Sequence, residues 1–312
     1  MRKIYGVGET VLDIIFKGGQ PQAAKAGGSV LNSVVSMGRM GLPVSFISEY
    51  GMDDVGELID SFLNENGVNT ASVHRFEDGS TSLALAFLNE KNDAHYTFYK
   101  DFPGKRLDIE FPLLQKDDIL QFGSFYAIWP EIRNKIKKFI QTSHDRGALV
   151  LYDPNFRKSH LSELGSLKPL IVENMRMSSL IRGSDEDFVN IFRVNNADEA
   201  WEVVKNYTSC LVYTANTEGV YVRTNSFSGK FAVKTITPVS TIGAGDNFNA
   251  GILTSIYRNN ITRDQLAIIG SKEWGKIIET AVDFATHVCL SYENYIDLAF
   301  ASRYFSASSD HI

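Results

Sequence analysis

The sequence has few cysteines and no long apolar run, and each shortage excludes a class of protein. Its two cysteines, Cys210 and Cys289, lie far apart and outside any Cys-x-x-Cys pair. Such usage is typical of reduced, buried thiols and not of a disulfide framework. No stretch approaches the roughly 18 uncharged apolar residues of a membrane-spanning helix, and Glu9 and Asp13 interrupt the apolar run near the N-terminus. We therefore predict a cytoplasmic protein with no signal peptide and no membrane partner.

The chain also lacks the excess of basic residues that nucleic-acid binding requires. Lysine and arginine number 31 against 37 aspartate and glutamate residues, which gives a formal net charge of −6. A phosphate backbone is held mainly by clustered Lys and Arg. The densest basic stretch, residues 133–138, lies in a helical pattern typical of a solvated helix face. We expect no nucleic-acid partner, and the six histidines show no metal-ligand spacing.

The chain does contain an alternation of apolar strand patterns and amphipathic helix patterns. Strands are predicted at residues 4–7, 44–48, 122–128, 149–152 and 211–214, and helices at 30–40, 53–66, 131–146, 246–257 and 273–290. This order predicts a mostly parallel sheet covered by helices. The segments at about 11–25 and 68–103 have hairpin-like patterns and are predicted to form a small appended sheet. We expect a single domain over residues 1–312.

The most informative segment lies between residues 235 and 253. A strand predicted to end near Thr237 leads into Gly243-Ala244-Gly245-Asp246, where a helix begins. A glycine loop at a helix N-terminus can bind an anion, because small residues let backbone N–H groups approach it and the helix dipole adds positive potential. Asp246 could then accept a proton from an attacking hydroxyl. The motif alone leaves open a plain turn capped by Asp246, while the lack of GxxxxGK[ST] excludes a P-loop.

Four further motifs precede the glycine loop along the chain. Gly8-Glu9-x-x-x-Asp13 precedes Gly27-Gly28-Ser29-x-x-Asn32, then come Gly51-x-Asp53-x-x-Gly56 and Asp153-Pro154-Asn155-Phe156-Arg157, and the glycine loop follows. Together they resemble the ribokinase-like (PfkB) carbohydrate kinases over nearly the whole chain, and the fourth resembles the family's fructokinase and 2-keto-3-deoxygluconate kinase branches. The resemblance implies a three-layer α/β/α sandwich with a small β-sheet lid over the sugar.

The resemblance also implies a role for each matching residue. Asp246 would be the general base, and the N–H groups of Gly243, Ala244 and Gly245 would form an anion hole. The residues that would contact the sugar are Asp13, Gly27, Gly28, Asn32, Phe98, Lys100, Asn155 and Arg157. Those that would contact ATP are Ser184, Thr214, Asn216, Glu218, Gly219, Gly243, Gly245 and Thr286. Mg²⁺ would be carried on the ATP phosphates, with Asp187 reaching it through water.

Four positions depart from the family pattern. Lys100 stands where fructokinase-like relatives have an arginine, and it keeps the charge without the planar fork. Ser240 replaces an aspartate that helps to hold a monovalent cation in many members, so activation by potassium stays open. Asn216 stands at a glycine position, where asparagine tolerates left-handed backbone better than most residues. Ser184 replaces the asparagine of an Asn-x-x-Glu segment. None of these changes removes the predicted base or the anion hole.

The implied activity is ATP-dependent phosphorylation of a sugar hydroxyl, with fructose as the first substrate to test. The alternatives of 2-keto-3-deoxygluconate, ribose and nucleosides stay open, and Phe98, Tyr99 and Trp129 could supply an aromatic pocket for a base. A catalytically degenerate regulator that binds sugar or nucleotide is the non-enzymatic alternative, although retention of Asp246 disfavours it. The apolar faces predicted on the lid strands could pair two copies in a homodimer.

Overall fold

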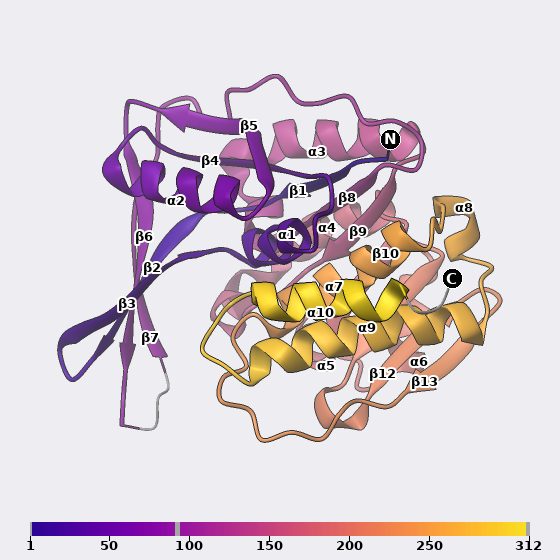
Figure 1. Ribbon diagram of the computed structural model, residues 1–312. Coiled ribbons are helices and arrows are strands. Elements are labelled where there is room, and N and C mark those ends of the chain that lie inside the picture. The colour runs from indigo at the N-terminus through magenta and orange to yellow at the C-terminus, as the bar shows by residue number, and fades with distance from the viewer. Residues whose placement is uncertain (1, 91–93, 310–312) are drawn as a thin grey trace.

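The structure, a computed structural model, describes residues 2–90 and 94–309. Within these residues the main feature is a nine-stranded sheet of order β13-β12-β11-β10-β9-β8-β1-β4-β5 (Figure 1). Its strands are β1 Ile4–Val7, β4 Val44–Gly51, β5 Val68–Phe76, β8 Ile119–Gly123, β9 Leu149–Asp153, β10 Leu180–Ser184, β11 Cys210–Thr214, β12 Val220–Thr224 and β13 Ser228–Phe231. All neighbours from β5 to β11 are parallel, whereas β12 and β13 pair antiparallel at one edge. The predicted mostly parallel sheet is confirmed.

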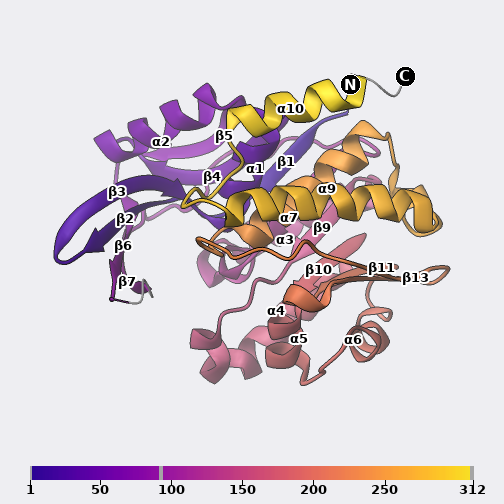
Figure 2. The same ribbon diagram turned by 60° about the horizontal axis from the view of Figure 1, so that its bottom comes forward.

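Helices cover both faces of this sheet and give three layers (Figure 2). The first face carries α1 Ser29–Arg39, α2 Asp54–Glu65, α7 Ala244–Arg258, α8 Arg263–Leu266, α9 Ser271–Cys289 and α10 Leu298–Ser309. The second carries α3 Pro130–Asp145, α4 Leu164–Arg176, α5 Asp185–Phe192 and α6 Ala197–Val204. Strands covered on both faces need apolar residues throughout, which explains the short apolar runs of the sequence. No helix of the described ranges combines the length and apolarity needed to span a membrane.

A smaller sheet of order β3-β2-β6-β7 extends from one side of this body (Figure 1). Its strands are β2 Val11–Lys17, β3 Gln20–Gly27, β6 Ser80–Leu88 and β7 Ala94–Asp101. Asp13 on β2 and Phe98 on β7 both pair in register with Ala84 on the strand between them. Because residues level with one another in a sheet share a face, Asp13 and Phe98 lie on the same side of the small sheet.

One boundary of the small sheet differs from the sequence prediction. We expected residues 68–103 to contribute to it, but β5 pairs in parallel with β4 and belongs to the large sheet. The chain crosses to the small sheet only at β6. Asp53, the N-cap of α2, fixes the start of β6 through hydrogen bonds with Thr81. One carboxylate oxygen of Asp53 accepts from Gly56 N and Thr81 Oγ1, both at 2.7 Å, and the other accepts from Thr81 N at 2.7 Å. The two hairpin strands expected between residues 68 and 103 were predicted to be joined by a turn at residues 89–93, of which 91–93 lie outside the described residues.

Two strand predictions need correction. The strand expected over residues 122–128 ends at Gly123, because Ser124 adopts a left-handed φ of 57° and a short 3₁₀ helix, Phe125–Ile128, follows. The strand expected to end near Thr237 does not form, since the last strand ends at Phe231 and the chain to Gly243 is irregular. That segment is held by the end of α9, where Val239 N donates to Cys289 O at 2.8 Å.

Candidate active site

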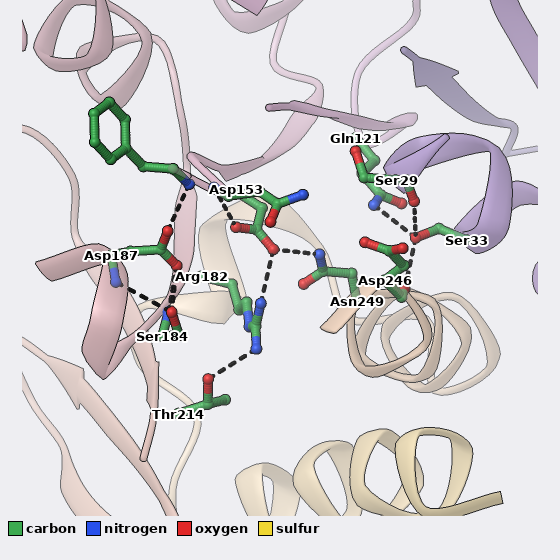
Figure 3. Close-up of polar contacts among 12 residues, drawn as sticks. Ser29, Ser33, Gln121, Asp153, Arg182, Ser184, Asp187, Thr214, Asp246 and Asn249 are labelled. Atoms are coloured by element: carbon green, nitrogen blue, oxygen red, sulfur yellow. Dashed lines mark hydrogen bonds and ion pairs between the residues drawn. The ribbon is translucent and has the colours of Figure 1, made fainter. Parts of the chain in front are cut away.

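The carboxyl ends of three neighbouring strands meet beside the N-terminus of α7 (Figure 3). Asp153 is the last residue of β9, Ser184 ends β10, and Thr214 ends β11 in register with Ser184. Parallel strands direct these ends to one edge of the sheet, which is where ligands bind in open α/β folds. Polar side chains from separate parts of the sequence therefore gather at one place.

Asp246 lies in the first turn of α7 and is half-buried. Its carboxyl oxygen Oδ2 accepts a hydrogen bond from Asn32 Nδ2 of α1 at 2.8 Å. Burial raises the pKa of Asp246 to about 7, although the hydrogen bond from Asn32 lowers it. The negative charge of Asp153 also raises this pKa, and the positive charges of Arg157 and Arg182 lower it. A carboxyl that titrates near neutral pH is well suited to take a proton from a hydroxyl.

The glycine loop ahead of α7 turns through a left-handed residue. Gly243 has a φ of 76°, and a Cβ atom there would lie 2.8 Å from the carbonyl oxygen of Asn294. The N–H of Ala244 donates to Thr241 O at 3.3 Å. The N–H groups of Gly245 and Asp246 fall in the first helical turn, where a helix offers no acceptor of its own. The loop thus presents backbone donors beside the Asp246 carboxyl, as an anion site requires.

Hydrogen bonds from α1 and from the segment after α9 fix the start of α7. Ser33 Oγ donates to the carbonyl oxygen of Asp246 at 2.6 Å (Figure 3). Ser36 Oγ donates to Asn247 Oδ1 at 2.5 Å, and Asn247 Nδ2 donates to Asn294 O at 2.7 Å. The position of the glycine loop is therefore set by two segments that are remote from it in sequence.

The N-terminal motif residues lie where β2, β3 and α1 meet. A Cβ on Gly27 would lie 2.0 Å from Asp13 Oδ2, and one on Gly28, whose φ is 138°, would lie 2.2 Å from Glu9 O. Both glycines thus let the chain approach the Asp13 strand closely. Burial raises the pKa of Asp13 to about 7, and the charge of Glu9 adds to the rise. Asn32 follows on α1, and its buried Oδ1 has no hydrogen-bond partner within residues 2–90 and 94–309.

Aromatic and basic side chains of β7 occupy the small-sheet side of the site. The rings of Tyr96 and Phe98 stack with their centroids 5.9 Å apart, and Phe98 is 56% exposed. Lys100 Nζ pairs with the Glu9 carboxylate and lies 4.3 Å from the centroid of the Trp129 ring. Lys100 is therefore already engaged by an anion and an aromatic face of the protein.

Tyr96 of β7 responds to charges from two parts of the chain. Burial raises the pKa of Tyr96, the charge of Asp13 raises it further, and the charge of Arg157 lowers it. Both charged groups must lie near the Tyr96 hydroxyl to act on it. Arg157 itself is exposed and follows β9. Charges from the small sheet and from the segment after β9 therefore both act on Tyr96.

The segment from Asp153 to Arg157 is held in a tight turn. Asn155 has a left-handed φ of 40°, and its N–H donates to Asp153 Oδ1 at 3.0 Å. Phe156 N donates to Asp187 Oδ1 at 2.6 Å, and the other oxygen of Asp187 accepts from Ser184 N and Oγ at 2.8 and 2.7 Å. Burial and the neighbouring Asp153 charge raise the pKa of Asp187. Both oxygens of Asp187 are thus occupied by protein donors, and Ser184 serves as the N-cap of α5.

The other residues that the resemblance assigns to ATP lie at the ends of β10 and β11, in the turn after β11 and on α9. Ala215 N donates to Gly219 O at 2.9 Å, which closes a turn in which Asn216 has a φ of 46° and Gly219 a φ of 122°. Asn216 thus adopts the left-handed conformation expected of it, and Glu218 is exposed beside it. Thr286 is half-buried on α9, which packs against α7.

Two residues of this cluster were not predicted from the sequence. Arg182 of β10 donates through Nη1 to Asp153 Oδ2 at 2.9 Å and through Nη2 to Thr214 Oγ1 at 2.8 Å. Asn249, one turn after Asp246, donates from Nδ2 to the same Asp153 oxygen at 2.7 Å. A signal was available, because Arg182 interrupts an apolar strand near its carboxyl end and Asn249 interrupts a helix whose neighbours are apolar.

A family model described as pfkB family carbohydrate kinase matches residues 1–290. The probable fructokinase-6, chloroplastic, of Arabidopsis thaliana is 27% identical over 238 residues, which cover 74% of this chain and 62% of that protein. Fructokinase-2 of Solanum lycopersicum is 25% identical over 236 residues, which cover 74% of this chain and 72% of that protein. The chain therefore spans just under two thirds of the first of these relatives.

Solved structures share the fold along their whole length. Aminoimidazole riboside kinase from Salmonella enterica, complexed with aminoimidazole riboside and an ATP analogue, superposes with a TM-score of 0.83 at 18% identity, covering 98% of this chain and 99% of that one. Fructokinase from Vibrio cholerae O395, bound to fructose, ADP and calcium, gives a TM-score of 0.81 at 21% identity, covering 97% and 98%. At these identities the likeness is one of fold, and it includes the smaller sheet.

Proposed function

The chain belongs to the pfkB family of carbohydrate kinases, and we propose that it transfers the terminal phosphoryl group of ATP to a hydroxyl group of a small sugar. One observation carries the proposal. The Asp246 carboxyl and the N–H donors of the glycine loop occupy a single turn at the ligand-binding edge of the sheet. Phosphoryl transfer needs a positioned nucleophile and donors directed at the transferring group, and this turn offers groups for both.

The proposed reaction uses Asp246 as general base. The sugar oxygen attacks the terminal phosphorus as its proton passes to the Asp246 carboxylate, the new O–P bond forms, and the bond to the ADP oxygen breaks. The N–H groups of Gly243 and Gly245 stabilise the negative charge on the transferring group. The N–H of Ala244, which has Thr241 O as an acceptor at 3.3 Å, would have to exchange it for phosphate. Asn32 orients the base by its hydrogen bond.

The sugar would lie between the small sheet and Asp246. Asp13 and Asn32 each present an oxygen to which a sugar hydroxyl could donate a hydrogen bond. The Asn32 oxygen accepts no hydrogen bond from the described chain. Burying such an atom without a partner costs about 1–3 kcal/mol, so a hydroxyl donor there would recover part of that cost. Gly27 and Gly28 leave room for this approach. We assign the further lining to Phe98, Lys100, Asn155 and Arg157.

ATP would bind across the loop, next to the turn from Thr214 to Gly219, with Ser184 and Thr286 further along the same side. The oxygens of Asp187 and Asp153 accept hydrogen bonds from the protein, and among the described residues no cluster of three His, Cys, Asp or Glu side chains could hold a metal. Mg²⁺ would be bound to the nucleotide phosphates and would contact Asp187 through water, beside the protein hydrogen bonds of that carboxyl. Such an ion would neutralise phosphate charge.

Fructose is the sugar we propose to test first. The relatives named fructokinases and the Asp153-to-Arg157 segment support it. The stacked rings of Tyr96 and Phe98 favour a nucleoside as the second candidate, because an aromatic face can stack on a base.

The deciding experiment is an ADP-release assay with fructose, ribose, 2-keto-3-deoxygluconate and a panel of nucleosides, run beside calorimetric binding of each compound. We expect one of them to support sustained ADP release that depends on the acceptor. Tight binding of a sugar without any turnover would contradict the kinase and support the alternative of a degenerate regulator.

A further inference from the structure

An arginine is buried between the ends of three strands and the start of α7. Arg182 is 9% exposed and reaches Asp153 on β9 and Thr214 on β11 through separate nitrogens, at 2.9 and 2.8 Å. A guanidinium is planar and permanently charged, so two fixed partners determine its plane as well as its position. Figure 3 shows this bridge next to the Asp246 turn.

The guanidinium also touches the glycine loop itself. A Cβ atom on residue 245 would lie 2.9 Å from Arg182 Nη1, so the third residue of the loop is a glycine where the arginine needs the space. The Arg182 guanidinium lies 5.5 Å from the centroid of the Phe248 ring, one turn further along α7. The first turn of α7 therefore packs against the Arg182 guanidinium.

The hydrogen bonds around Arg182 are unevenly distributed. Asp153 Oδ2 accepts from both Arg182 and Asn249, while Arg182 Nε is buried without a partner in the described part of the chain. The charged groups that act on Asp246 are Asp153, Arg157 and Arg182. Of the two cations only Arg182 is buried, where its field is less screened by water.

We propose that Arg182 is a positioning residue for phosphoryl transfer, which fixes the first turn of α7 through Gly245 and Asp153 and adds a permanent positive charge behind the anion-binding loop. This role rests on the proposed function for its effect on turnover. The effect of Arg182 on nucleotide binding is independent of the proposed function. A positive charge there favours ATP over ADP and ADP over AMP, because their negative charge decreases in that order, whether or not a sugar is phosphorylated.

The test compares Arg182→Met and Arg182→Lys with the wild type. Calorimetry measures the affinity for AMP, ADP and a non-hydrolysable ATP analogue, and turnover is measured on the best acceptor. We expect Arg182→Met to lower kcat by about 100-fold while the sugar KM changes by less than about threefold. Its loss of affinity should be largest for the ATP analogue and smallest for AMP. Arg182→Lys should recover the preference for the ATP analogue and part of kcat.

Arg133→Met is the matched control, because Arg133 is a similarly buried arginine that pairs with Glu173 and Asn174 on the opposite face of the sheet. It should change the melting temperature and leave the nucleotide series unchanged. If Arg182→Met weakens AMP and the ATP analogue by equal factors, or if Arg182→Lys is as impaired as Arg182→Met, the role is structural and the proposal is wrong.

A variant that removes only the arginine leaves the buried Asp153 carboxylate uncompensated and could fail to fold. The double variant Arg182→Met with Asp153→Asn removes both charges, and it is the second protein to measure. Because a positive and a negative charge are removed together, the graded loss across the three nucleotides should be smaller than in Arg182→Met, while kcat should stay low because the first turn of α7 is no longer fixed. A graded loss as large as that of Arg182→Met, or a kcat equal to that of the wild type, would overturn the proposal. If the wild type phosphorylates none of the acceptors but Arg182→Met still shows the graded loss of nucleotide affinity, the proposed kinase activity is contradicted and the role of Arg182 in nucleotide binding is supported.

Discussion

Asn32 donates a hydrogen bond to Asp246 at 2.8 Å across a sequence separation of 214 residues. This contact joins a residue predicted to bind the sugar to the residue predicted to be the general base. The amide group of Asn32 has two ends with different tasks. Its Nδ2 is used by Asp246, while its Oδ1 is left with no protein partner in the described ranges. A sugar hydroxyl bound to that oxygen would stand one side chain away from the group that is proposed to deprotonate it.

Replacement of Asp246 by asparagine tests the base directly. The amide is nearly isosteric with the carboxyl but cannot take a proton, so we expect kcat to fall by about 10²–10⁴-fold. ATP binding should stay nearly unchanged, because the loop donors are backbone groups. Steady-state kinetics and calorimetry with an ATP analogue provide the two measurements. A loss of only a few fold would show that another group is the base.

The raised pKa of Asp13 predicts a pH-dependent cost in stability. The folded pKa is about 7 against an ordinary 3.8, so the folded state holds the proton more tightly than the unfolded chain. The unfolding free energy therefore falls as pH rises from about 4 to about 7, and the full cost persists above that range. Asp13→Asn should raise the melting temperature at pH 8 and have little effect near pH 4.

Thermal melts of Asp13→Asn and the wild type at a series of pH values check this. Glu65→Gln serves as the control because Glu65 is an exposed carboxylate on α2, and it should give a difference that does not grow with pH. A stabilisation by Asp13→Asn that is equal at pH 4 and pH 8 would contradict the assignment.

Gly243→Ala should distort the anion-binding loop. Residue 243 has a φ of 76°, and the new Cβ would lie 2.8 Å from the Asn294 carbonyl oxygen. Left-handed backbone costs a non-glycine residue about 1–2 kcal/mol even without a clash. We expect lower thermal stability and a larger loss in kcat than in sugar affinity. Gly165→Ala is the matched control, because Gly165 lies in α4 with nothing within 4 Å of its Cβ position. That change should be neutral or slightly stabilising.

Lys25 on β3 links the small sheet to the segment after α9, and this predicts a charge-dependent closure over the proposed sugar site. Lys25 Nζ donates to Glu293 Oε1 and to Tyr292 O, both at 2.8 Å. The next residue, Asn294, buttresses the glycine loop. Lys25→Glu should raise the sugar KM several-fold and increase ATP hydrolysis without sugar, because water reaches the site more easily.

The paired exchange Lys25→Glu with Glu293→Lys provides the decisive comparison. It restores the opposite charges, so it should recover most of the sugar KM and suppress the sugar-independent ADP release again. Failure of the exchange to recover either quantity, with normal folding of both variants, would show that the contact does not control closure.

Local patterns in the sequence were sufficient for much of this protein. The helix over residues 54–65 was predictable because Asp53 is a capping residue and Gly67 a natural end, and both effects act within a few residues. The parallel sheet followed from the alternation of apolar runs and amphipathic helices. The glycine loop and Asp246 could be predicted as a candidate anion site with a carboxylate because the motif is contiguous.

The tertiary structure decided what depends on partners distant in the chain. Val68–Phe76 has the pattern of a strand for either sheet, and only the free edge of β4 decides which one it joins. Arg182, as a lone cation in a strand, gave no sign of its partners, because Asp153, Thr214 and Gly245 approach it only when three strands and α7 are assembled. The sequence alone thus located the glycine loop and its carboxyl, whereas only the folded chain placed the buried Arg182 behind them.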